Sequence, residues 1–102
     1  MTLDEFKALL LTADVTATHY YSVQQGNYTI WQEYGADHLP GDNKYLDRKW
    51  RIQVDRFTKL ENDPVVDAIT AVLDREDIAY SYQVDFEMDT KYIHHIWDCE
   101  VM

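Results

Sequence analysis

The sequence predicts an α+β domain in which two helices pack on one face of a mainly antiparallel sheet of about five strands. Two helix-start signals each precede apolar residues at helical spacing, and the remaining segments alternate between apolar and polar residues. The 102 residues contain no repeat, linker or low-complexity tract, so we expect a single domain over 1–102. The elements are expected in the order α-β-β-β-α-β-β.

The first helix is predicted to follow Thr2. Thr2 and Glu5 have the spacing of a capping box, in which each side chain bonds to the other residue's backbone N–H. The helix should end near 12–14, where β-branched and polar residues take over. Its apolar residues share one face: Leu3, Phe6, Leu9 and Leu10.

A hairpin is expected after this helix. The segments 18–24 and 28–34 are rich in tyrosine and β-branched residues, and 25–27 form a short turn that contains a glycine. Gly35 is expected to close the second strand. The stretch 36–44 holds the densest cluster of turn-forming residues in the chain, and we interpret it as an exposed loop.

A long strand is predicted over roughly 45–57. Its alternation indicates a sheet with one buried and one solvated face. Arg48 interrupts the apolar parity near the outer end, and Arg56 and Phe57 reverse it at the other, so the ends of the strand are expected to leave the sheet. The residues expected to point inward are Leu46, Trp50, Ile52 and Val54.

The second helix has the clearest start in the chain. Asp63 is a favoured N-cap residue, and Pro64 suits the first helical position, where its missing N–H costs nothing. The apolar stripe that follows consists of Val66, Ile69, Val72 and Leu73.

A second hairpin is predicted to end the sheet. The segment 78–88 alternates strictly, with Ile78, Tyr80, Tyr82, Val84, Phe86 and Met88 on one side. Residues 88–91 provide the turn. In the last strand, 92–101, one face carries Ile93, His95, Trp97, Cys99 and Val101.

The composition favours an acidic protein of a reducing compartment. Nineteen acidic and nine basic residues give a formal charge of −10, which disfavours binding to nucleic acid and to anionic membranes. The acidic surface is either simply solvated, complementary to a basic partner, or the lining of a passage for DNA. Cys99 is the only cysteine, so no intramolecular disulfide can form. No export signal and no apolar stretch of about 20 residues is present, so a soluble, non-exported protein is expected.

Four potential metal ligands lie close together near the end of the chain, but on different faces of the predicted strand. His95 and Cys99 point one way, whereas His94 and Asp98 point the other. A structural zinc site needs four converging ligands. We therefore expect no metal site and interpret these residues as ordinary members of the sheet.

Catalytic arrangements are also not expected. Cys99 lies four residues from His95 along the strand, roughly 13 Å away, so a catalytic pair would need His19 or His38. Paired carboxylates on the solvated face have no predicted pocket. No glycine-rich loop leads into a helix, which removes the common nucleotide-binding fingerprints. The sequence thus predicts a protein that is not an enzyme and has no cofactor.

Aromatic residues predict a partner instead. One face of the sheet must accommodate more apolar surface than two short helices can cover, and an apolar remainder on a sheet is typical of an interaction surface. Tyrosines also suit a half-exposed sheet without any partner, which leaves both interpretations open. The residues concerned are Tyr20, Tyr28, Tyr34, Tyr45, Tyr92 and Ile96.

Several segments in the right order resemble a known family from about residue 20 onward. They are YTIWQEYG at 28–35, DNK at 42–44, DRFTK at 55–59, DPVVDAI at 63–69 and TKYIHHIW at 90–97. The chain resembles small tail proteins of phages and prophages of Gram-positive bacteria, the tail terminator or tail completion proteins of long, non-contractile tails.

The resemblance implies a structural protein of the virion. Such proteins share this order of elements and form a ring, commonly of six subunits, that caps the tail tube and meets the head–tail connector protein. The expected partners are other copies of the chain, the tail tube protein and the connector protein, and the expected location is the host cytoplasm and then the virion tail. No catalytic residues are implied. As a hypothesis, Asp37, His38, Asp42 and Asp47 contact a neighbouring subunit or the tube, and the acidic residues among them face the tube or its lumen, where DNA passes.

Two other functions remain as alternatives. An acidic inhibitor that mimics DNA would occupy a nucleic-acid-binding protein of the host, but the Lys and Arg residues dispersed over 44–59 argue against it. A small enzyme using His94, His95, Asp98 or Cys99 would need a deep pocket and perturbed titration.

Overall fold

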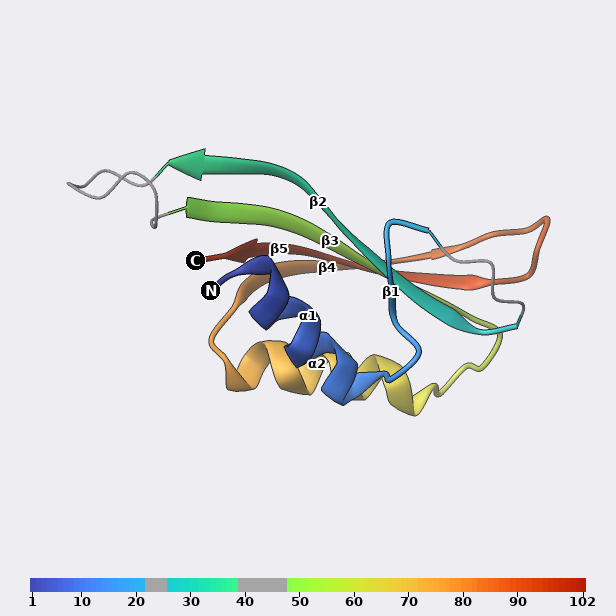
Figure 1. Ribbon diagram of the computed structural model, residues 1–102. Coiled ribbons are helices and arrows are strands. Elements are labelled where there is room, and N and C mark those ends of the chain that lie inside the picture. Colours follow the sequence, from blue (N-terminus) through green and yellow to red (C-terminus); the bar gives the residue numbers. More distant parts are fainter. Residues whose placement is uncertain (22–25, 39–47) are drawn as a thin grey trace.

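The computed structural model describes residues 1–21, 26–38 and 48–102 and has the predicted α+β fold (Figure 1). Both helices lie on one face of a five-stranded mixed sheet with the strand order β1-β2-β3-β5-β4. The predicted order of elements is confirmed. The elements are α1 (Leu3–Ala13), β1 (Thr18–His19), β2 (Tyr28–His38), β3 (Arg48–Thr58), α2 (Pro64–Arg75), β4 (Ala79–Phe86) and β5 (Ile93–Val101).

Both helices begin where the sequence predicted. The Glu5 N–H donates to Thr2 Oγ1 over 3.1 Å, and the Thr2 N–H donates to Glu5 Oε1 over 3.0 Å, which completes the capping box of α1. At α2, Asp63 Oδ1 accepts from the Val65 N–H over 3.0 Å. Backbone donors that a helix start leaves without partners are thereby satisfied.

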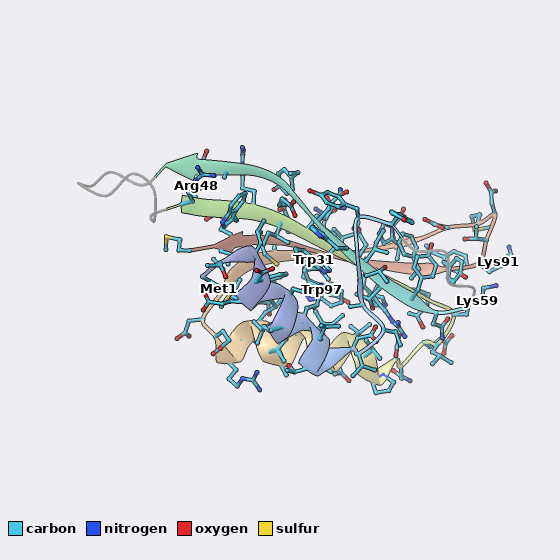
Figure 2. All side chains as sticks on the ribbon, in the orientation of Figure 1. Met1, Trp31, Arg48, Lys59, Lys91 and Trp97 are labelled. Atoms are coloured by element: carbon cyan, nitrogen blue, oxygen red, sulfur yellow. The ribbon has the colours of Figure 1, made fainter. Side chains whose placement is uncertain are left out.

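The core lies between the helices and the central strands β3 and β5. Figure 2 shows Trp31 and Trp97 between the sheet and the helices, and both are almost fully buried. Burying large aromatic side chains such as these removes much apolar surface from water. The core residues are Phe6, Leu9, Leu10, Trp31, Ile52, Val54, Ile69, Val72, Leu73, Ile78, Trp97, Cys99 and Val101.

The predicted first hairpin is wrong, because β1 runs parallel to β2. Within the described residues, Thr18 and His19 pair with β2, with Thr18 opposite Ile30, and the chain then turns at Tyr20, which has a φ of 73°. The predicted strand and turn residues 22–25 lie outside the described residues. The ring of His19 stacks on Trp31 at a centroid distance of 3.9 Å. Strand propensity does not specify polarity. The direction of β1 follows from the route by which the chain leaves α1 and reaches the edge of the sheet.

Gly35 does not end the second strand, which continues to His38. A register shift between Glu33 and Gly35 marks a β-bulge, and a Cβ at position 35 would overlap the guanidinium of Arg51. A side chain at this position would have to displace the flexible end of Arg51, so the glycine accommodates a close approach rather than a turn. Of the predicted loop, 36–38 belong to β2, and 39–44 lie outside the described residues.

Both ends of β3 differ from the prediction, because the strand includes Arg48, which pairs with His38, as well as its last residues. Arg56 and Phe57 stay in the sheet, opposite Thr29 and Tyr28 of β2. Arg56 keeps the inward parity and is buried with an exposure of 6%, while Phe57 lies on the outer face. The alternation of side chains is unbroken, but the inward position holds an ion instead of a hydrophobe. Residues 45–47, including Leu46, lie outside the described residues.

Candidate assembly surface

The outer strand β4 carries an exposed apolar row. β4 pairs with β5 and has no second neighbour among the described strands. From Tyr82 onward, the apolar side chains at every second position of β4 and of the turn after it are about half exposed or more: Tyr82 (44%), Val84 (52%), Phe86 (50%) and Met88 (67%). The sequence predicted that these residues share one side of the strand, without assigning that side to the core or to solvent. The turn end of the β4–β5 hairpin extends past both helices, which leaves the row uncovered (Figure 1).

A groove of about 390 Å³ runs between β4 and α2. Tyr80 and Tyr82 form its strand side, and the Tyr80 hydroxyl donates to Asp74 Oδ1 over 2.8 Å. Asp67 and Asp74 give the helix side a negative rim, and both residues are exposed. The groove adjoins the apolar row, so this edge of the molecule combines the backbone groups and apolar side chains of β4 with the carboxylates of α2. The remaining lining residues are Val66, Thr70 and Ala71.

A buried ion cluster fixes the helix ends against the sheet. The guanidinium of Arg56 donates to Asp63 Oδ2 over 2.8 Å, to Thr29 Oγ1 over 3.3 Å and to Asp14 Oδ2 over 3.4 Å. Burial alone would raise the pKa of both carboxyls, but hydrogen bonds from Thr16 to Asp14 and from Arg56 to Asp63 outweigh it, so both pKa values lie below the usual range. The cluster links the end of α1, β3 and the start of α2.

His95 adjoins the apolar row on the inner side. It is 8% exposed, and its Nδ1 lies 2.6 Å from the Tyr82 hydroxyl. Its Nε2 has no hydrogen-bond partner within the part of the chain that the structure describes. Burial lowers the pKa of His95, because the charged imidazolium is poorly solvated there. The lowered pKa favours neutral His95, and its contact with Tyr82 joins β4 to β5.

The four potential metal ligands lie as the sequence predicted, on two faces. His95 and Cys99 are buried on the helix side. His94 lies on the opposite face, with its Nε2 2.7 Å from Asp55 Oδ1, and Asp98 accepts a hydrogen bond from Tyr34 over 2.5 Å. Burial raises the pKa of the Cys99 thiol to about 12, which disfavours the thiolate. Among the described residues, no group of three His, Cys, Asp or Glu side chains could hold a metal ion.

The face of the sheet away from the helices holds an aromatic cluster. Phe57 stacks on Tyr28 at 4.8 Å and on His94 at 4.1 Å between ring centroids. Tyr92 meets both Tyr28 and Phe57 edge-on, and Lys59 lies 4.9 Å from its ring centroid. These contacts cover much of the predicted apolar surface on this face. Tyr34 and Tyr20 remain about half exposed, and Tyr45 lies outside the described residues.

Of the predicted contact residues, Asp37 and His38 lie at the end of β2. Asp37 is exposed on β2, opposite Lys49, and its carboxylate lies 4.0 Å from the guanidinium of Arg51. His38 is the last residue of β2. Asp42 and Asp47 lie outside the described residues, so their expected role stays a prediction.

Sequence reasoning missed the exposure of β4. The alternation correctly grouped these residues on one side of the strand but gave no information on where the helices end relative to it. The length of the predicted β4–β5 hairpin was a signal that could have indicated this exposure. A helix of the length of α2 covers only part of so long a hairpin.

No family model matches the chain, and no curated protein matches it either. No helix within the described residues has the length and apolar character needed to cross a membrane.

Proposed function

We propose that the chain is a structural subunit of a phage tail that caps the tail tube as a ring and joins it to the head–tail connector protein. The observation that carries the proposal is the apolar row on β4, together with the free edge of that strand. Assembly begins in the host cytoplasm and places the protein in the virion tail.

The β4 edge has two properties that favour assembly, unpaired backbone groups and exposed apolar side chains. An outer strand presents a row of N–H and C=O groups that can pair with another chain, and monomers commonly protect such edges with charge, proline or a bulge. β4 has apolar side chains at Tyr82, Val84 and Phe86 instead, each 44–52% exposed. Burial of such a row between copies stabilises an assembly by removing apolar surface from water.

The charge of the chain fits the passage of DNA through a tail. A formal charge of −10 keeps separate subunits soluble and repels phosphate groups. Asp37 lies at the end of the sheet away from the β4–β5 turn, on the β2–β3 pair (Figure 1). In the proposed ring Asp37 contacts a neighbouring subunit or the tube, and the same role is expected of Asp42 and Asp47.

The proposal is tested by the mass of the protein in solution. Light scattering is measured on the chain alone and after mixing with the tail tube protein of the same phage, and tube length is followed by electron microscopy. The expected result is a ring, about six times the mass of one chain, or a ring that forms on the tube and stops its growth. A monomer that leaves tube growth unchanged would refute the proposal.

A matched pair of variants separates the apolar row from the rest of β4. Val84→Ser with Phe86→Ser removes apolar surface on the helix side and is expected to abolish ring formation. Asp85→Asn changes the opposite face of the same strand, where the residue is exposed, and is expected to leave ring formation intact. Equal effects of the two variants would contradict the role of the row.

A further inference from the structure

The sheet has two edges that lack a complete partner. At one side, β4 pairs only with β5. At the other side, β1 pairs with Ile30 and Trp31 of β2, and within the described residues no strand pairs with the outer side of β2 from Gly35 to His38. Backbone N–H and C=O groups on both edges are therefore open to pairing with another chain.

The directions of these two edge strands match a head-to-tail arrangement. Each neighbouring pair from β2 through β3 and β5 to β4 is antiparallel, so β2 and β4 run in opposite directions. A second copy placed beside the first in the same orientation brings its β2 against β4 as an antiparallel pair. The helix side of one sheet then continues into the helix side of the next, and the sheet continues from copy to copy.

Charges on the two edges are complementary. Asp67 and Asp74 line the groove between α2 and β4 on the helix side of the sheet. Arg48, opposite His38 at the end of β2, lies on the same side, with its guanidinium 5.8 Å from the Trp50 ring centroid. No carboxylate among the described residues forms an ion pair with Arg48, which leaves its charge available to a neighbour. Figure 2 shows Arg48 at the start of β3, far from Lys59 and Lys91.

We infer that β4 of one copy pairs with the Gly35–His38 segment of β2 in the next copy, so that Arg48 of that copy lies against Asp67 and Asp74. This inference deepens the proposed function, since it rests on a ring of identical subunits. Repeated head-to-tail contacts generate a closed ring when the rotation between copies closes. A twofold pairing of two β4 strands would instead bring two acidic grooves together, which like-charge repulsion disfavours.

The side-chain parities define a test by cross-linking. In an antiparallel pair that places Tyr80 opposite His38, Ser81 lies opposite Asp37, on the face away from the helices, and both residues are exposed. The variants Ser81→Cys and Asp37→Cys are mixed in equal amounts, assembled with the tail tube protein, and treated with a short bis-maleimide. The native Cys99 is fully buried with a pKa of about 12 and is expected not to react.

The mixture is expected to give a covalent dimer, whereas neither variant alone should give one. Mixing Ser81→Cys with Lys7→Cys, an exposed position on α1, provides the matched control and should give none. Cross-linking of Ser81→Cys to itself would show the twofold pairing and overturn the inference. Capped tubes without the mixed dimer would also overturn it while leaving the proposed function intact. A chain that neither assembles nor caps tubes would remove both.

A charge exchange tests the contact across the two edges. Arg48→Glu and Asp67→Lys are each expected to lower the yield of mixed dimer about two- to fivefold, the effect of one exposed ion pair. Combining Arg48→Glu on the Asp37→Cys copy with Asp67→Lys on the Ser81→Cys copy should restore the yield. Failure of the combination to restore it, with both variants folded by circular dichroism, would contradict the inferred contact.

Discussion

β4 and β5 are neighbouring strands with the same alternation and different burial. Val84 and His95 face each other across the pair, yet Val84 is 52% exposed and His95 is 8% exposed. β5 lies inside the sheet, between β3 and β4, while β4 lies at its edge. The comparison shows that alternation specifies which face a residue occupies, whereas position in the sheet and the reach of the helices decide whether that face is covered.

The largest expected effect is on the buried strand. Trp97 on β5 is fully buried and lies opposite Tyr82. Trp97→Ala is expected to lower the free energy of unfolding by about 3–5 kcal/mol, since it removes a large apolar side chain and leaves a cavity. Urea unfolding followed by circular dichroism measures the loss. A change below about 1 kcal/mol would contradict the central place of β5 in the core.

Loss of the buried cation is expected to have the next largest effect. Arg56→Met keeps much of the apolar length of the side chain but leaves Asp14 and Asp63 without their shared partner. The expected cost is about 3 kcal/mol at neutral pH, because two buried carboxylates lose their counter-charge. Urea unfolding at pH 7 measures it. Restoration of stability in the triple variant with Asp14→Asn and Asp63→Asn would confirm that the carboxylates cause the loss.

A smaller effect is expected from pH. The pKa of His95 is lowered from its ordinary value of 6.5, so the unfolded chain binds this proton more readily than the folded chain. Above pH 6.5 the residue is neutral in both states and contributes no difference, and stability falls as the pH drops below 6.5. His95→Gln should reduce the fall between pH 7 and pH 5 in thermal unfolding. An unchanged slope would show that other groups cause it.

The carboxyls of the ion cluster act in a lower range of pH. Their pKa values lie below the ordinary value of 3.8, so their stabilising effect is present above that value and is lost as the pH falls through the lowered pKa values. The free energy of unfolding is measured between pH 5 and pH 2 in the wild type and in Arg56→Met, which separates the effect of the carboxyls from the effect of His95 at higher pH. The variant is expected to lose less stability below pH 4, because its carboxyls have lost the cation.

The smallest effect on stability is expected on the exposed strand. Val84→Ser should change the free energy of unfolding of the monomer by no more than about 0.5 kcal/mol, because the side chain is already half exposed. The same variant is expected to weaken ring formation, as measured by light scattering. A large loss of monomer stability would show that Val84 is buried in the isolated chain, against the comparison with β5.

The sequence alone determined the features that depend on neighbouring residues. The capping box of Thr2 and Glu5, the N-cap Asp63 and the face of each residue in β4 and β5 all follow from spacings of a few positions, and the structure confirms them. The order of elements and the α+β class follow in turn. Such features rest on local hydrogen bonds and on the geometry of helix and strand, which a short stretch of sequence specifies.

Only the tertiary structure decided the polarity of β1, the close approach of Arg51 to Gly35, the burial of Arg56 and the exposure of the apolar row. Each of these depends on contacts between residues far apart in the chain. From the sequence, Arg56 is expected to be exposed because it is charged. Its burial is possible because the fold brings Asp14 and Asp63 next to it, and they supply the counter-charge. An apolar side chain such as that of Val84 is commonly buried. It is half exposed here because the β4–β5 hairpin extends past the helices, and burial depends on how far a packed neighbour extends.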